Sequence, residues 1–290
     1  MRLPLENELE MRAGASRRIR RVVVAVDFSP ASLANAAWAA RHFATSAEVT
    51  FVHVTSDRGV PNVGHERTGW RQARRAVTDA RERNLRGALY GLASIGGDAR
   101  IDVEVRAGDP AAELAAFADA VGADLIVTGP TATSPLLPSE EAATTERLLR
   151  RTVRPVLIAR GAQPSMAETV LAAIGGDADA PAVLGAARMI ADPRDGRVAV
   201  LHVDNEPSMS LASIDSWLHA ADIPRARSMS VTATGDVVRA IRRAARDLEA
   251  GVVAVGVRAH PRETAEHRRE IARSLVTTAT KSVLVVPITG

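Results

Sequence analysis

Short runs of apolar, largely β-branched residues recur along this chain, and segments with helical spacing separate them. The runs 22–26, 125–128 and 252–255 are continuous, which is typical of strands buried on both faces in a parallel sheet. Between such runs, apolar residues fall on one helix face, at Leu114, Phe117, Ala118 and Val121 and again at Val237, Ile241, Ala244 and Leu248. This alternation predicts an α/β fold.

The second half of the chain repeats the first. The apolar runs 22–26 and 170–174 have the same shape 148 residues apart, and the run 50–54 matches 199–203 at an offset of 149. Three further pairs share an offset of 127: Gly108-Asp109 with Gly235-Asp236, Gly129 with Gly256, and Val156–Ile158 with Val283–Val285. Because all the matches occur in the same order, we infer a tandem duplication.

Each half contains the order β-α-β-α-β-α-β-α-β, which predicts two tandem doubly wound parallel five-stranded sheets related by pseudo-twofold symmetry. We assign residues 1–20 to an N-terminal extension, 21–160 to the first domain, 161–168 to a linker and 169–290 to the second domain. We expect the strands ending at Ile158 and Val286 to pair across the interface between the domains, because exposed apolar edges need cover.

The two halves differ between their second and third strands, where the offset falls from 149 to 127 and the second half lacks 22 residues. In the first half this segment predicts a long amphipathic helix over roughly 70–92. In the second half it predicts only a short helix over 213–221, around Trp217. Asp109-Pro110 and Asp236 stand where a helix start favours a capping carboxylate.

The composition excludes several kinds of chemistry. The chain has 290 residues and no cysteine, which excludes disulfides, thiolate zinc sites and cysteine nucleophiles. No apolar run approaches the ~18 residues of a membrane span, and the first twenty residues lack the pattern of a signal peptide. We therefore expect a cytoplasmic protein with no membrane partner. The net charge is only +3 and aromatic residues make up 3%, which argues against a nucleic-acid partner.

Motifs in both halves carry a resemblance to a known family. In the first half they are Val-Asp-x-Ser at 26–29, His-Val at 53–54, Gly-Asp-Pro at 108–110, Ala-Asp-Leu-Ile-Val-x-Gly at 123–129 and Arg-Pro-Val-Leu-Ile at 154–158. In this order and spacing they resemble the universal stress protein family. Both halves fit, from about 21 to 159 and from about 169 to 287.

The resemblance implies a doubly wound α/β fold and, in the nucleotide-binding branch, a site for ATP. That branch carries Gly-x2-Gly-x9-Gly followed by Ser or Thr, whose glycines let backbone N–H groups approach the phosphates. Here the four positions hold Gly129, Ala132, Ala142 and Ala143, and Pro130 removes one N–H. The candidate contacts for an adenine nucleotide in the first half are Asp27, Ser29, Val54, Gly129, Thr131, Ala132 and Thr144.

The second half departs further from this signature. Gly175 stands in the place of the acid after the first strand, and Asp177 stands in the place of the serine. The four loop positions hold Gly256, Ala259, Arg269 and Glu270. The candidate contacts here are Gly256, Arg258 and Ala259, in a cationic stretch that forms either a loose anion site or a solvated arginine-rich loop.

At the candidate residues two interpretations stay open. Asp27 either hydrogen-bonds an adenine or ribose edge, as the resemblance implies, or caps the following helix together with Ser29. His53 and His202 lie inside apolar strands, which favours structural histidines over ligands. Ser29 has no evident His–acid partner, so we assign no catalytic residue, and we assign no metal site.

Three functional hypotheses follow. The leading one is a stress-response protein that acts by binding rather than catalysis, with weak or lost ATP binding and no certain cofactor. The first alternative is an adenine-nucleotide sensor that uses the first half. The second is a nucleotide-hydrolysing enzyme, which would need a set of metal-binding carboxylates where only Asp27 is evident. We expect the two domains to pair within the chain, and a homodimer or an unidentified protein are further candidate partners.

Overall fold

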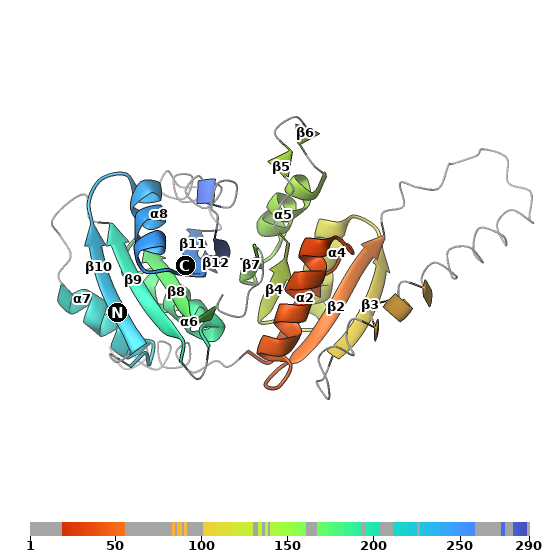
Figure 1. Ribbon diagram of the computed structural model, residues 1–290, viewed down its shortest axis with the longest axis horizontal. Helices are drawn as coiled ribbons and strands as arrows, with labels where there is room; N and C mark the ends of the chain where they lie inside the picture. The colour runs from red at the N-terminus through yellow and green to blue at the C-terminus, as the bar shows by residue number, and fades with distance from the viewer. Residues whose placement is uncertain are drawn as a thin grey trace, which may run out of the picture.

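The structure of the chain is a computed structural model in which ten strands form one sheet with helices on both faces (Figure 1). It describes residues 19–55, 83–84, 86–88, 90–91, 101–129, 133–134, 137–138, 140–160, 167–192, 195–203, 211–224, 227–258, 274–275 and 281–288.

The first half contributes five parallel strands in the spatial order β3-β2-β1-β4-β7. Their bounds are Arg21–Ala25 (β1), Glu48–Thr55 (β2), Ile101–Ala107 (β3), Leu125–Thr128 (β4) and Val156–Ile158 (β7). The helices of this half are α2 (Pro30–Phe43), α4 (Pro110–Ala120) and α5 (Glu140–Arg151). Two short antiparallel strands, β5 (Thr133–Ser134) and β6 (Leu137–Pro138), precede α5.

The second half repeats this topology, with the spatial order β10-β9-β8-β11-β12 and parallel pairing throughout. Its strands are Thr169–Ile174 (β8), Arg197–Val203 (β9), Ser228–Ala233 (β10), Val252–Arg258 (β11) and Ser282–Ile288 (β12). Its helices are α6 (Ala180–Ile190), α7 (Leu211–Ala220) and α8 (Val237–Asp247). The predicted α/β fold, with its doubly wound parallel strands, is therefore confirmed.

The two halves join through an antiparallel pair of strands. β7 pairs with β12, and Leu157 lies opposite Leu284 at the centre of the pair. Both leucines are fully buried, because each strand covers the apolar edge of the other. The pairing predicted for these strands is thus confirmed, and the two predicted five-stranded sheets are halves of one ten-stranded sheet.

A second contact between the halves follows the same symmetry. Nε2 of His42, at the end of α2, lies 3.0 Å from the carbonyl oxygen of Ile190, at the end of α6. His42 and Ile190 are equivalent positions of the repeat, as are Leu157 and Leu284. Contacts between equivalent positions are what a pseudo-twofold axis between the halves requires.

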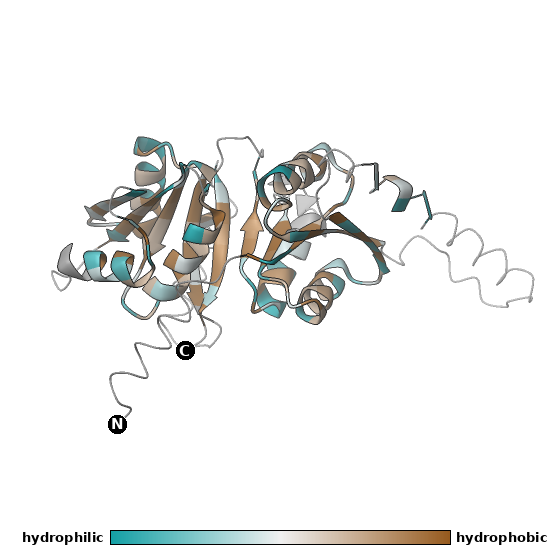
Figure 2. Ribbon diagram, turned by 90° about the horizontal axis from the view of Figure 1, so that it is seen from below, coloured by the Kyte–Doolittle hydropathy of each residue, from teal (hydrophilic) through white to brown (hydrophobic). Residues whose placement is uncertain are grey.

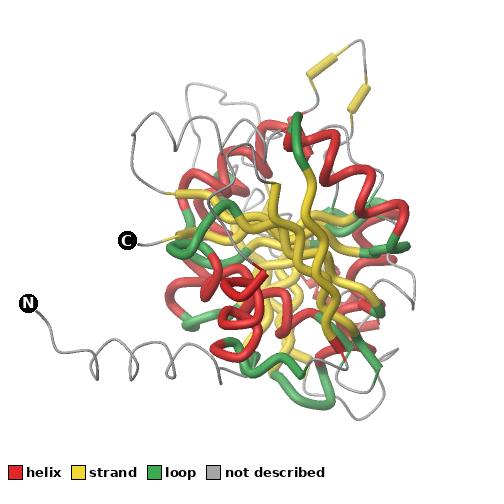
Figure 3. The backbone as a smooth tube through the Cα atoms, turned by 90° about the vertical axis from the view of Figure 1, so that its left-hand side faces the viewer, coloured by secondary structure: helices red, strands yellow, loops and turns green. Residues whose placement is uncertain are grey.

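Two apolar layers cover the sheet. Side chains of α2, α6 and α7 pack on one face, and side chains of α4, α5 and α8 pack on the other. Figure 2 shows the most hydrophobic residues concentrated along the central strands, and Figure 3 shows helices on both sides of the twisted sheet. Burial on both faces explains why the strand sequences are continuous apolar runs rather than alternating ones.

The predicted helix starts are confirmed at two equivalent places. Oδ1 of Asp109 accepts a hydrogen bond from the backbone N–H of Ala112 at 3.0 Å and caps α4. Oδ1 of Asp236 accepts one from the N–H of Arg239 at 2.7 Å and caps α8. The duplication therefore preserved the cap together with the helix.

The segments that differ between the halves are described in part. The short helix predicted around Trp217 is α7. The long helix predicted over 70–92 lies mostly outside the described residues, although those described between 83 and 91 are helical. Residues 161–166 of the predicted linker also lie outside the described residues.

The packed body begins slightly before the predicted first domain. Ile19, which we assigned to the N-terminal extension, is 7% exposed and belongs to the core. The backbone N–H of Arg20 donates to Oδ2 of Asp124 at 2.8 Å, at the start of β4. Ile19 therefore packs with the sheet, and the Asp124 carboxylate satisfies the backbone that leads into β1.

Candidate functional site

The topology places the candidate site of each half at the carboxyl ends of its central strands. In the first half β1 lies between β2 and β4, and in the second half β8 lies between β9 and β11. The connections leave β1 and β8 in opposite directions, so a switch point lies at the carboxyl ends of β1 and β4 and of β8 and β11. Ligands of doubly wound sheets bind beyond such points.

The turn after β1 is built by Asp27, Phe28 and Ser29. Oδ1 of Asp27 accepts a hydrogen bond from the backbone N–H of Ser29 at 2.8 Å. Oγ of Ser29 accepts one from the N–H of Ser32 at 3.2 Å and caps α2. Phe28 adopts a left-handed backbone with φ of 64°, which turns the chain between strand and helix. The capping interpretation of Asp27 and Ser29 thus has direct support, although Ser29 rather than Asp27 caps the helix.

These contacts also set the charge of the turn. Partial burial raises the pKa of Asp27, but hydrogen bonds from Ser29 and Ser32 favour the carboxylate and bring the pKa below its ordinary value. Asp27 is therefore ionised at neutral pH, and its side chain is exposed. It can accept hydrogen bonds from a ligand and cannot donate them.

The two strand histidines have the same structural role in both halves. Nδ1 of His53 lies 2.7 Å from the carbonyl oxygen of Val26, and Nδ1 of His202 lies 2.9 Å from that of Ile174. Each bond ties the end of the second strand of its half to the end of the first. The prediction that these are structural histidines is confirmed by these paired contacts.

Gly129 directly follows β4, and a polar side chain lies behind it. Nδ2 of Asn35, on α2, lies 3.7 Å from the position that a Cβ at Gly129 would take, and it donates to the carbonyl oxygen of Ala159 at 3.1 Å. Asn35 is 1% exposed, and its Oδ1 has no hydrogen-bond partner within the part of the chain that the structure describes. The switch point of the first half therefore carries an unsatisfied buried acceptor.

Sequence reasoning did not find Asn35. The available signal was a polar residue on the face of α2 that otherwise buries Ala36, Trp38 and Ala39. A polar residue on a buried helix face is unusual, but only the packing of α2 shows that Asn35 lies at the switch point.

The equivalent place in the second half is apolar. Val183 stands at the position equivalent to Asn35, and Gly256 at the position equivalent to Gly129. A Cβ at Gly256 would lie 3.1 Å from Cγ2 of Val183 and 3.1 Å from Cγ1 and Cδ1 of Ile288. Gly256 also lies within β11, whereas Gly129 lies beyond the end of β4. Gly256 therefore has a packing role that the sequence analysis did not assign to it.

The turn after β8 is also occupied from within the chain. Nε1 of Trp217, on α7, donates to Oδ1 of Asp177 at 2.8 Å. The indole of Trp217 lies edge-on to the imidazole of His202, with 6.3 Å between ring centroids. The Asp177 carboxylate, which replaces the serine of the first half, is thus already hydrogen-bonded to an indole N–H of the chain itself.

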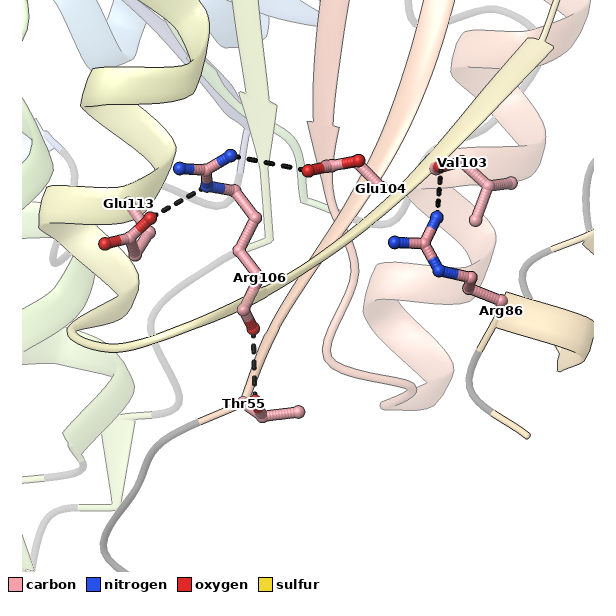
Figure 4. Close-up of polar contacts among 6 residues, drawn as sticks. All are labelled: Thr55, Arg86, Val103, Glu104, Arg106 and Glu113. Carbon is pink, nitrogen blue, oxygen red and sulfur yellow. Dashed lines mark hydrogen bonds and ion pairs between the residues drawn. The ribbon is translucent and has the colours of Figure 1, made fainter. Parts of the chain in front are cut away.

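Contacts at the carboxyl end of β2 stiffen the far side of the first-half site. Oγ1 of Thr55, which follows the half-buried Val54, donates to the carbonyl oxygen of Arg106 on β3 at 3.1 Å. The Arg106 guanidinium donates to Glu113 at 2.8 Å and Glu104 at 3.3 Å (Figure 4). The Thr55 bond joins the ends of β2 and β3 beside Val54, and the bond to Glu113 joins β3 to α4.

The remaining predicted contacts are only partly described. Thr144 lies on α5 and its Oγ1 accepts a hydrogen bond from Nη2 of Arg147 at 3.4 Å. Arg258 is the last residue of β11. Thr131, Ala132 and Ala259 lie outside the described residues. Among the residues that are described, no group of three His, Asp or Glu side chains could hold a metal ion.

Comparison with protein families finds one family that matches the first half of the chain. The model of the universal stress protein family matches residues 18–160, which include the turn after β1, Asn35 and Gly129. Residues 18–160, about half of the chain, therefore form a domain of the universal stress protein family. No curated protein matches the chain.

Solved structures extend the likeness in fold over both halves of the chain. A universal stress protein from Archaeoglobus fulgidus is 18% identical, with 93% of this chain and 97% of that chain covered and a TM-score of 0.69. A functionally unknown protein from Pseudomonas aeruginosa is 17% identical, with coverages of 96% and 94% and a TM-score of 0.59. At these identities the likeness shows the fold of the whole chain. No described helix is long and apolar enough to span a membrane.

Proposed function

We propose that this chain is a cytoplasmic stress-response protein that acts by binding without catalytic turnover, and that its first half binds an adenine nucleotide weakly. The observation that carries the proposal is the contrast between the two switch points. The first has Gly129 with the buried Asn35 behind it, whose Oδ1 has no hydrogen-bond partner among the described residues, whereas the second is lined by Val183 and Ile288. Among the described residues, the surroundings of the first switch point are therefore polar and those of the second are apolar.

The exposed carboxylate of Asp27 supports an adenine nucleoside as the bound group. It is ionised, it projects from the turn after β1, and it can accept hydrogen bonds from an exocyclic amine or a ribose hydroxyl. We expect weak binding because Ala132 and Ala142 replace two glycines of the phosphate loop, Ala143 replaces its Ser or Thr, and Pro130 lacks an N–H. We propose binding without turnover because Asp27 is the only carboxylate evident in the sequence where a nucleotide-hydrolysing enzyme would need a metal-binding set.

Calorimetric titration of the full chain with ATP, ADP and AMP tests the proposal. We expect one weak site per chain, and we expect Asp27→Ala to weaken it about tenfold or more, since a hydrogen bond to a charged group contributes about 1.5–3 kcal/mol. Asn35→Val, which copies the second half, should also weaken binding. Asp177→Asn is the matched control, because its amide oxygen can still accept from Trp217 and binding should not change.

Three results would contradict the proposal. Absence of heat with millimolar ATP in the wild type would leave a scaffold that binds another protein. Equal affinity in wild type, Asp27→Ala and Asn35→Val would place the nucleotide elsewhere. Phosphate release above background in the presence of Mg²⁺ would contradict binding without turnover.

A further inference from the structure

Among the described strands, β3 and β10 lie at the two ends of the ten-stranded sheet, and each pairs with a strand on one side only. An edge strand presents unpaired backbone N–H and C=O groups, and natural proteins usually protect it with charges, proline or a covering segment. The two edges of this sheet differ in such protection.

The β3 edge is protected. Three of its seven residues are charged, namely Asp102, Glu104 and Arg106, and Arg106 is held between Glu104 and Glu113. Nη1 of Arg86 also donates to the backbone carbonyl oxygen of Val103 at 3.4 Å (Figure 4). A second strand would therefore meet charged side chains and a carbonyl that is already bonded.

The strand β10 itself lacks these protective features. Its sequence, Ser-Met-Ser-Val-Thr-Ala, contains no charge and no proline. Met229, Ser230 and Thr232 are exposed, and Met229 is one of three large hydrophobic residues that are exposed in the described part of the chain. This strand is suited to pairing with another strand.

We propose that β10 is the homodimer interface of this protein, where the β10 strands of two copies pair antiparallel about a twofold axis at Val231. The sheet then runs on from one copy into the other. This proposal does not depend on nucleotide binding by the first half.

Charge and symmetry favour a second copy of this chain as the partner that pairs with β10. Exposed Arg227 precedes β10 and exposed Asp236 follows it, so antiparallel pairing brings the cationic end of each strand to the anionic end of its partner. The uncharged strand meets no like charge when it pairs with itself. The apolar edges β7 and β12 are already used within the chain, so they are not open to a second copy.

The geometry of antiparallel strands restricts the register to those in which one residue lies opposite its own copy, and we place the axis at Val231, near the centre of β10. Two opposed residues either exchange both backbone hydrogen bonds or neither, so a twofold axis must pass through a pair of identical residues. An axis at Val231 places Ser230 opposite Thr232 and Met229 opposite Ala233 of the other copy. The same axis places Arg227 opposite Gly235, next to Asp236.

Light scattering on the full chain during size-exclusion chromatography tests the proposal. We expect the wild type to have twice the chain mass of 30.7 kDa. Ser230→Lys with Thr232→Lys places like charges opposite each other and should give a monomer at the concentration at which the wild type is dimeric. Ser230→Lys with Thr232→Glu places opposite charges face to face and should restore the dimer. Asp102→Lys, at the other edge, is the control and should stay dimeric.

The double variants change only exposed positions, so circular dichroism and Tm should match those of the wild type. A monomeric wild type, expected if the edge instead receives an extended segment of another protein, would overturn the proposal. A dimer that persists with lysine at both positions would also overturn it. So would loss of the dimer in the lysine–glutamate variant, because that result excludes antiparallel pairing about Val231.

Discussion

Gly129 and Gly256 are equivalent residues of the repeat with different surroundings. A methyl group at Gly129 would make an ordinary contact with Asn35, at 3.7 Å. A methyl group at Gly256 would lie 3.1 Å from Val183 and Ile288, both β-branched and buried, so neither can move aside easily. The same substitution therefore makes an ordinary contact in one half and overpacks the core in the other.

We expect Gly256→Ala to lower the free energy of unfolding by about 1–3 kcal/mol, because it overpacks the core. Gly129→Ala, the matched control, should stay within about 1 kcal/mol of the wild type. Chemical denaturation of both variants measures the difference. Equal stability of the two variants would show that Val183 and Ile288 can rearrange, and would remove the packing role of Gly256.

At the scale of elements, the two conserved caps offer a comparison within one molecule. Asp109→Ala and Asp236→Ala each remove a carboxylate that accepts from the first turn of a helix, so each should cost about 1 kcal/mol. Asp109 also pairs with Arg147 at 3.2 Å, but this partly exposed ion pair should add little. Thermal unfolding should show a loss of about 2–4 °C in each variant.

Asp109→Asn and Asp236→Asn separate the cap from the charge, because an asparagine oxygen can still accept the hydrogen bond. Both should retain most of the wild-type Tm. If asparagine cost as much as alanine, charge rather than capping would explain the effect of Asp109 and Asp236.

Element lengths also show where prediction from sequence stops. The apolar runs locate β1, β4 and β11, and the Gly-Asp pairs locate the starts of α4 and α8. The sequence aligns Gly129 with Gly256 but does not reveal that β11 continues through Arg258 while β4 ends at Thr128. The difference arises from the neighbouring strand, since β12 pairs with β11 as far as Ile288 whereas β7 ends at Ile158.

The candidate site shows the same limit. Sequence motifs identify Asp27, Ser29 and Gly129, which lie at the carboxyl ends of β1 and β4 in the structure. They do not identify Asn35 or its apolar counterpart Val183, because the importance of both depends on how α2 and α6 pack across the sheet. A local sequence pattern indicates the helix or strand to which a residue belongs. It does not indicate which residue of a neighbouring element that residue contacts, and Asn35 and Val183 matter through their contacts with Gly129 and Gly256.

At the scale of the whole molecule, His42 joins the two halves away from the paired strands. Its Nε2 contacts the carbonyl oxygen of Ile190, and its ring stacks on Trp38 with 4.8 Å between centroids. Burial lowers the pKa of His42 below the usual 6.5, although the bond to Ile190 and the charge of Asp192 act in the opposite direction. The ring is therefore harder to protonate in the folded chain than in the unfolded one.

This difference makes the junction sensitive to acid. Between the folded pKa of His42 and the usual value of 6.5, the unfolded chain binds more protons, so stability falls as pH falls through that interval and is fully present above it. We expect His42→Gln, whose amide can still donate to Ile190, to lose this part of the pH dependence. Denaturant titrations at a series of pH values compare the two proteins. If both lost stability equally on acidification, the Ile190 and Asp192 contacts would outweigh burial, and His42 would not weaken the junction in acid.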